Sequence, residues 1–356
     1  MQLFDDRSLA RAALGRGVPA FLLVNPIEYH GPHLSLRNDH LVSVGVARDL
    51  HAELRRRVGL AGAPEEAYRL LLTRDLDVGV EPAPGPGSEP VDYFEVRRAV
   101  LDACRELAAL GASRVVLVTF HGSPLHAYAL EAGVRWLRRR GVRAISPMGE
   151  LLWELLAAES PEGAAGSRYA EAYAHLPAER ARALMADIAS DFHGGFFETS
   201  LALHYAPESV RAFYTELPDC APFAGPRLVA RGVARLRGLG ARARVRAEEV
   251  SLVARGAAWL SLRPFPGYTG APSLATPAAG RVFARELTAR FGDAAEAALH
   301  RGEAPRPPPL GWLRWATLFG RVGVHAGPGD MLRFDHLATE GGRARDGSAQ
   351  FAGSST

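Results

Sequence analysis

The sequence predicts an α/β protein built as a single three-layer domain, with a mostly parallel sheet flanked by helices on both faces. Short apolar runs alternate with longer segments of helical spacing, and this order is typical of parallel sheets. The first apolar run, residues 20–28, ends in polar residues, as buried parallel strands do. The chain has 356 residues, 47% of them hydrophobic and 23% charged, which suits a soluble protein with a sizeable core.

The elements follow in order along the chain. Strands are expected over residues 20–28, 69–79, 113–123 and 142–150. Helices are expected over residues 40–57, 91–111 and 124–141, and residues 81–90 form a Pro/Gly-rich loop. Residues 151–190 are predicted to be mostly helical, with a flexible break at 160–167. Since ligands of such sheets bind at the carboxyl ends of the strands, His30-Gly31 and His121-Gly122 are expected to face one site.

Composition excludes several classes of protein. All 42 basic residues are arginine, and the formal net charge is only +3. Residues 224–256 hold eight arginines and two glutamates without interleaved aromatic residues, so we expect a solvated surface and no nucleic-acid partner. Two cysteines form neither a disulfide framework nor a CxxC motif. No secretory signal and no apolar stretch of about 18 residues is found, so we expect a cytoplasmic protein with no membrane partner.

One short segment, residues 26–40, concentrates titratable side chains just after the first strand. Glu28 and His30 stand two residues apart, and side chains at this spacing in an extended chain point to the same side. Asp39 comes at the start of the next helix, where it either caps the helix or bridges two metal ions. A second histidine, His121, follows another strand. This combination suits Zn, Mn or Fe better than Ca or Mg.

A third concentration lies at residues 190–205. Gly194 and Gly195 allow a close backbone approach beside His193, and Glu198 is expected to open a helix. Thr199 or Ser200, taken alone, is a possible helix cap. Together with the other clusters, His193 becomes a candidate proton shuttle and Glu198 a candidate ligand or proton acceptor.

Four motifs resemble those of the creatininase family of metal-dependent amidohydrolases. They are E-Y-H-G-P-H-L-S-L-R-N-D from residue 28, T-F-H-G-S-P from 119, H-G-G-F-F-E-T-S from 193, and G-Y-T-G-A-P-S-L-A-T-P-A-A-G from 267. The resemblance covers about residues 17–295. It implies a catalytic domain over 1–300 with insertions near 150–185 and 208–260, followed by a Pro-rich linker and C-terminal tail over 301–356. The tail is expected to be disordered from about residue 340.

The resemblance also implies roles for individual residues. Two divalent metal ions are expected, one held by Glu28, Asp39 and His121. The second is held by His30 and the bridging Asp39. Creatinine hydrolases proper add a glutamate at the position of Ser123, which is no substitute for a carboxylate, so Glu198 is the best remaining donor. The loss of this glutamate and of both asparagines of the N-G-H-G-G-N motif counts against creatinine as the substrate.

The reaction expected from the resemblance is hydrolysis of a C–N amide bond in a cyclic amide, formamide or peptide-like small molecule. A metal-bound hydroxide attacks the carbonyl, and His193 protonates the leaving nitrogen. Ser123 and Ser88 are candidate substrate-binding residues. The alternatives are a non-hydrolytic metal-binding partner, or a lyase or isomerase on the same fold. Relatives are commonly ring-shaped, so we expect a homo-oligomer, with a hexamer as one form.

Overall fold

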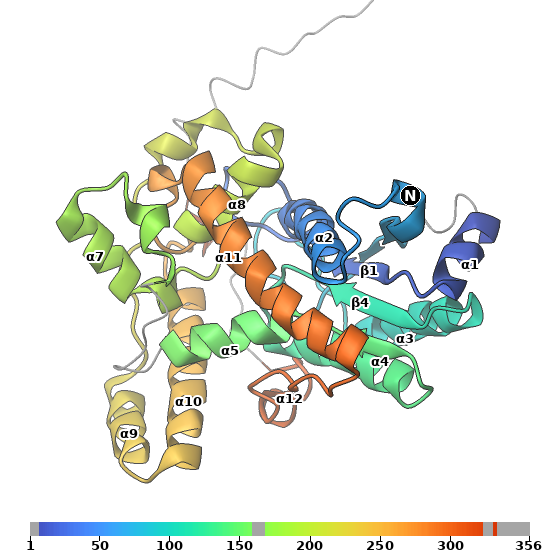
Figure 1. The fold of residues 1–356 in the computed structure, drawn as a ribbon. Helices are drawn as coiled ribbons and strands as arrows, with labels where there is room; N and C mark the ends of the chain where they lie inside the picture. The colour runs from blue at the N-terminus through green and yellow to red at the C-terminus, as the bar shows by residue number, and fades with distance from the viewer. Residues whose placement is uncertain (1–6, 159–167, 323–329, 333–356) are drawn as a thin grey trace, which may run out of the picture.

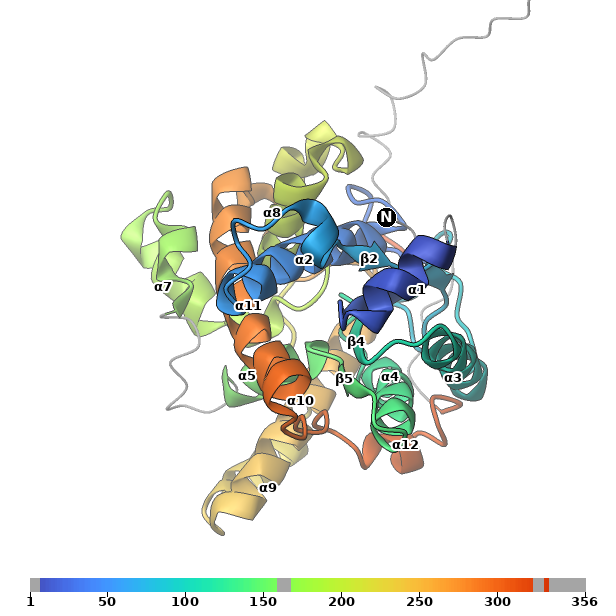
Figure 2. The same cartoon turned by 45° about the vertical axis from the view of Figure 1, so that its right-hand side comes forward.

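The computed structural model describes residues 7–158, 168–322 and 330–332 (Figure 1). The predicted break at 160–167 and the predicted disordered tail from residue 340 lie outside the described residues. Within the described part, the architecture is the predicted one. A parallel sheet forms the middle layer, and helices cover both of its faces (Figure 2).

The sheet has the strand order β2-β1-β4-β5, and β3 pairs with β1 beyond the end of β2. Every pairing is parallel, and β1 lies in the centre between β4 and the short strands β2 and β3. The strand bounds are β1 Ala20–Asn25, β2 Leu71–Leu72, β3 Leu76–Asp77, β4 Arg114–Val118 and β5 Arg143–Ile145. All six residues of β1 are buried, which explains its unbroken apolar sequence.

The predicted strand over residues 69–79 is in fact two short strands. β2 pairs with the start of β1 and β3 with its end, and Thr73 between them still donates its amide to the carbonyl of Phe21. Asp75 turns toward Arg37 and His40, at 3.7 Å and 3.5 Å. The polar residues Thr73, Arg74 and Asp75 thus separate the two short strands.

Two groups of helices enclose the sheet. One face packs against α2, α8 and α11, and the opposite face packs against α1, α3 and α4 (Figure 2). The helix bounds are α1 Arg7–Gly15, α2 Asn38–Arg57, α3 Tyr93–Ala109, α4 Pro124–Arg138, α5 Met148–Ala158, α7 Ala178–Ala186, α8 Phe196–Tyr205, α9 Arg227–Arg237, α10 Ala241–Leu260, α11 Pro277–Glu296 and α12 Leu313–Ala316. Successive residues of β1 alternate between the two cores, Phe21 facing the first and Leu22 the second.

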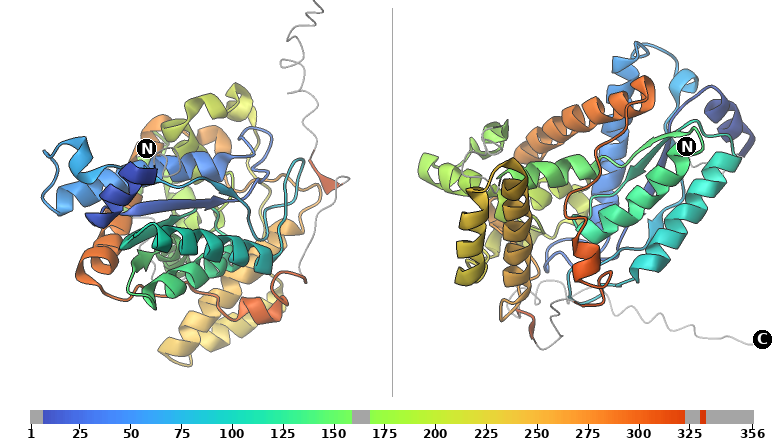
Figure 3. Two further views of the ribbon diagram at one scale, coloured as in Figure 1. Left: turned by 90° about the vertical axis from the view of Figure 1, so that its right-hand side faces the viewer. Right: turned by 90° about the horizontal axis from the view of Figure 1, so that it is seen from below.

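The C-terminal half extends around this core. Helices α9 and α10 form a hairpin that projects from the body beside α5 (Figures 1 and 3). Residues 301–310, predicted to be a linker, lie against the body. The carbonyl of Pro308 accepts a hydrogen bond from Tyr128, and the carbonyl of Pro307 accepts one from Trp153. The domain boundary at residue 300 stays a prediction. No described helix has the length and hydropathy needed to cross a membrane.

Candidate metal centre

The central strands β1 and β4 bring two of the predicted clusters together. Glu28 and His30 follow β1, and His121 follows β4, which pairs directly with β1. Because the two strands are parallel, the segments after them emerge at the same edge of the sheet. The prediction that the two His-Gly pairs meet at this edge is confirmed.

Two helices supply the remaining acidic groups. Asp39 lies in the first turn of α2, after an N-cap at Arg37, and no backbone amide of the described chain donates to its carboxylate. The capping alternative for Asp39 is therefore wrong. Glu198 lies in the first turn of α8, as predicted, and its Oε2 accepts a hydrogen bond from the backbone of Gly194 at 2.6 Å. Thr199 is inside this helix and does not cap it.

The donor atoms form two groups that share Asp39. In the first group, Nδ1 of His121 lies 2.8 Å from Oε2 of Glu28 and 3.6 Å from Oδ2 of Asp39. In the second, Nε2 of His30 lies 3.0 Å from Oδ1 of Asp39 and 3.7 Å from Oε2 of Glu198. Within each group, one ligand atom from each residue lies within 4.8 Å of the others. Asp39 thus presents one oxygen to each group.

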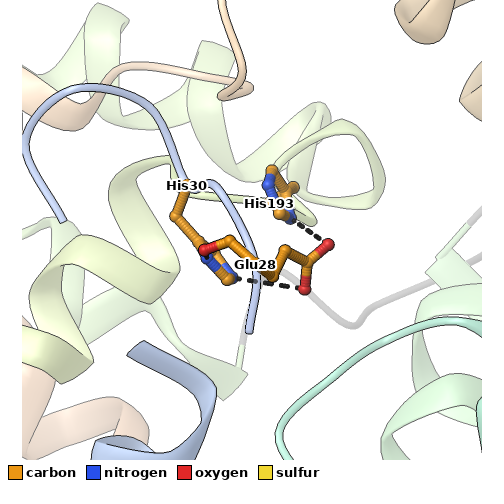
Figure 4. A group of neighbouring side chains, drawn as sticks. All are labelled: Glu28, His30 and His193. Carbon is orange, nitrogen blue, oxygen red and sulfur yellow. Dashed lines mark hydrogen bonds and ion pairs between the residues drawn. The ribbon is translucent and has the colours of Figure 1, made fainter. Parts of the chain in front are cut away.

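His193 stands beside these groups. Its ring stacks on that of His30 with centroids 4.3 Å apart, and its Nδ1 lies 3.9 Å from Oε1 of Glu28 (Figure 4). Nε2 of His193 lies 2.9 Å from the carbonyl oxygen of Tyr29. Since a carbonyl oxygen only accepts, Nε2 carries the hydrogen and Nδ1 keeps its lone pair. His193, Glu28 and His30 form a third group of donors within the same 4.8 Å limit.

Burial makes the cluster costly for the protein without a counter-charge. Glu28, His30 and Asp39 are at most 2% exposed, and His121, His193 and Glu198 are also buried. Oε2 of Glu28 and both oxygens of Asp39 are buried, and among the described residues only histidine nitrogens approach them. Buried charges need a partner, and no arginine of the described chain reaches these carboxylates. The donor set therefore fits a divalent cation.

The pKa values of the clustered side chains are shifted by burial and by the charges of their neighbours. Burial raises the pKa of Glu198 to about 8, and burial likewise raises the pKa of Asp39. Burial opposes the charged form of His30, but the charges of Asp39 and Glu28 outweigh it and raise the pKa of His30 to about 10. Burial, followed by the charge of His30, lowers the pKa of His193 to about 3. His193 is therefore neutral at pH 7.

Backbone groups hold the ligands in place. Nε2 of His121 donates to the carbonyl of Val80 at 2.9 Å, and the amide of Ala83 donates to Oε1 of Glu28 at 2.5 Å. Thr269, in the last of the four motifs, donates its amide to the carbonyl of His193 at 2.7 Å. This contact joins the last motif to the segment that carries His193. The sequence had indicated no role for that motif. Val80 and Ala83 act through backbone atoms, so no side chain marked them in the sequence.

The two serines predicted to bind substrate have structural partners. Ser88 accepts a hydrogen bond from the amide of Tyr29 and donates one to the carbonyl of Ala83. Ser123 caps α4 by accepting from the amide of His126, and its hydroxyl donates to Glu81 at 3.0 Å. Their role toward a substrate stays a prediction. Glu81, in the Pro/Gly-rich loop, carried no signal in the sequence.

Comparison with known proteins places the chain in a family. The creatininase family model, described as creatinine amidohydrolase, matches residues 8–295. Creatinine amidohydrolase of Pseudomonas putida is 27% identical over 203 residues, which are 56% of this chain and 69% of that protein.

Solved structures agree on the fold. A mutant creatininase complexed with creatine has a TM-score of 0.52 and 19% identity, with 84% of this chain and 98% of that chain covered. A manganese form of creatininase has a TM-score of 0.50 and 20% identity, with 82% and 95% covered. Since the family model spans most of the chain, including all six clustered side chains, the protein belongs to the creatininase family, whose members are hydrolases of C–N amide bonds.

Proposed function

We propose that the protein hydrolyses a C–N amide bond of a small molecule with two divalent cations held by the clustered side chains. The observation that carries this proposal is the pair of donor groups sharing Asp39, which is buried, faces histidine nitrogens and has no arginine partner among the described residues. Glu28, Asp39 and His121 would hold one cation, and His30, Asp39 and Glu198 the other. The mixture of imidazole and carboxylate donors favours zinc, manganese or iron. A solved relative is a manganese form.

When bound, such cations polarise a carbonyl oxygen and acidify water. The chain itself supplies orientation and proton transfer. The Nε2 hydrogen of His193 is fixed on the carbonyl of Tyr29, so the lone pair of Nδ1 is directed toward Glu28. Nδ1 is therefore the atom that takes a proton from attacking water and returns it to the leaving nitrogen. These two transfers make up the proton-shuttle role expected for His193.

The substrate is proposed to be an amide other than creatinine. The loop after β4 reads T-F-H-G-S-P, and Ser123 at its end is occupied by contacts with α4 and Glu81. A hydroxyl in this position is neutral and can donate a hydrogen bond, whereas a carboxylate is charged and only accepts. A homo-oligomeric assembly also stays part of the proposal.

A screen for amine release tests this function. The protein is loaded separately with Zn²⁺ and Mn²⁺ and offered formamides, lactams, short peptides and creatinine. We expect release from at least one class other than creatinine, and none after removal of metal with a chelator. Full metal occupancy without amine release from any class would contradict the proposal, and so would turnover that persists in the chelated protein.

A further inference from the structure

A loop residue outside the cluster, Glu81, lies between two contacts that brace the candidate ligands. The carbonyl of Val80, the residue before it, accepts the hydrogen of His121 Nε2. The amide of Ala83, two residues after it, donates to Glu28. Glu81 is thus held at the rim of the metal centre by bonds on either side of it in the chain. Its own carboxylate belongs to none of the candidate donor groups.

The backbone of Glu81 has an unusual conformation. Its φ angle is 56°, in the left-handed region that residues with a Cβ atom rarely adopt. Such conformations persist where surrounding contacts fix them, and they concentrate at functional sites. Here the fixed contacts are those of Val80 and Ala83 with the ligands. A glycine would suit this conformation better, so the presence of a glutamate calls for a reason.

The carboxylate of Glu81 is fixed in direction. Oε2 accepts a hydrogen bond from Ser123, which stands two residues after His121. On the other side, the backbone at Gly320 approaches closely, since a Cβ atom built there would lie 3.5 Å from Oε1 of Glu81. Burial raises the pKa of Glu81, while the hydrogen bond from Ser123 and the charge of His121 lower it. The side chain nevertheless remains exposed to solvent.

This carboxylate lacks a cationic partner among the residues that the structure describes. Within residues 7–158, 168–322 and 330–332, the only polar contact of its side chain is with Ser123, and no arginine lies within ion-pair distance. By contrast, Glu249 is paired with Arg246. A solvent-facing carboxylate that is oriented, unpaired and adjacent to a ligand is suited to bind a cationic group from outside the chain.

We propose that Glu81 is a specificity-determining residue that binds a cationic nitrogen group of the substrate, and that Ser123 positions its carboxylate. The substrate would then carry an amidinium or ammonium group near the amide bond that is cut. This inference deepens the proposed function and rests on the metal centre being the reaction site. It also gives Ser123 a positioning role in place of the direct substrate contact predicted from the sequence.

Binding of an isosteric pair of probes tests the inference without turnover. Acetamidinium and acetamide differ in charge but hardly in shape, and calorimetric titration at pH 8 into the zinc-loaded protein compares their affinities. We expect acetamidinium to bind at least about ten-fold more tightly, because a charge-assisted hydrogen bond is replaced by a neutral one in acetamide. Glu81→Gln should abolish this preference. Glu89→Gln, an exposed glutamate in the same loop, serves as the matched control and should retain it.

The outcomes separate the two proposals. Equal affinities in the unmodified protein, or a preference that survives in Glu81→Gln, would overturn the role of Glu81. An unchanged preference in Ser123→Ala would overturn the positioning role of Ser123. Metal content, measured in each variant, should stay at the level of the unmodified protein, and a loss in Glu81→Gln would show a structural role instead. Amine release by the unmodified protein is measured in parallel, so a protein that shows the preference but no hydrolysis refutes the proposed function alone.

Discussion

Two pairs of buried carboxylate side chains lie in different parts of the molecule, and the groups that face them differ. Glu28 and Asp39, at the sheet edge, are 2% and 1% exposed, and Glu248 and Glu249, on α10, are 4% and 3% exposed. Arg237 binds both oxygens of Glu248, at 3.0 Å and 2.7 Å. Glu249 accepts hydrogen bonds from Arg246, Trp312 and the amide of Leu310.

Among the residues that the structure describes, the pair at the sheet edge has no arginine or tryptophan partner. Within the described chain, only histidine nitrogens approach three of its four carboxylate oxygens. Burial is the same in both places, so burial alone does not identify a site. The difference lies in the counter-charge: arginines, which stay charged, neutralise the α10 pair, whereas the sheet-edge pair faces histidines, which can give up their protons to a cation from outside.

The largest effect is expected from Asp39→Asn. Asp39 contributes to both donor groups, and the amide keeps its size but removes the charge and one acceptor oxygen. We expect both cations to be lost and turnover to fall to that of chelated protein. Elemental analysis and amine release measure the two effects. Glu248→Gln is the matched control from the other pair and should keep its metal. Full occupancy in Asp39→Asn would remove Asp39 from the ligand set.

A smaller but still large effect is expected from His193→Ala. The variant should keep both cations, because each of the two proposed groups is complete without His193. Turnover should fall by about 10²–10⁴-fold, the usual contribution of a positioned acid–base group. Comparing kcat with metal content in the same preparation distinguishes the two roles. Loss of metal would instead assign His193 to the third donor group, with Glu28 and His30.

The metal-free centre predicts a dependence of stability on pH. The folded-state pKa values of His30 and His121 are raised to about 10 and about 9 from the usual histidine value of 6.5, because the neighbouring carboxylates outweigh burial. Their contribution to stability is therefore complete below pH 6.5 and is lost as the pH rises through 9 and 10.

Metal removal makes this dependence measurable. For chelated protein we expect the free energy of unfolding to fall by on the order of a few kcal/mol between pH 6.5 and 10. Zinc-loaded protein should show a weaker dependence, because binding displaces the protons from the ligands. Denaturant titrations at several pH values give the comparison. Identical slopes with and without metal would contradict the assignment of both histidines.

The smallest effect is expected from Glu249→Gln. The amide hydrogens of glutamine would meet the donors of Trp312 and Arg246, so one buried hydrogen bond is lost. We expect a loss of about 1–3 kcal/mol in the free energy of unfolding, with unchanged metal content. Urea denaturation checks the first part, and elemental analysis checks the second. A change in metal content would show that the two carboxylate pairs are not independent.

The sequence was sufficient to predict the sheet and the cluster, because both leave strong local signals. Buried strands such as β1 need unbroken apolar runs, and titratable residues as dense as Glu28, His30 and Asp39 rarely arise by chance. The convergence of His121 with them followed from the rule that parallel strands end at one edge. The choice between a helix cap and a bridging carboxylate for Asp39 needed coordinates, since both use the same residue at the same place.

Other features have no signature in the sequence. Val80 and Ala83 contribute a carbonyl and an amide, which every residue except proline carries. The left-handed backbone of Glu81 and its bond to Ser123 depend on contacts between segments about 40 residues apart. The seating of residues 301–310 against Tyr128 and Trp153 is also set by tertiary contacts, which outweigh the linker-like composition of that segment.

Anomalous X-ray diffraction from crystals of the zinc-loaded protein tests the central claim most directly. We predict two peaks, one about 2.0–2.3 Å from ligand atoms of Glu28, Asp39 and His121, the other at the same range from His30, Asp39 and Glu198. Peaks at other places, or none at this edge of the sheet, would show that the unpaired carboxylates serve another purpose.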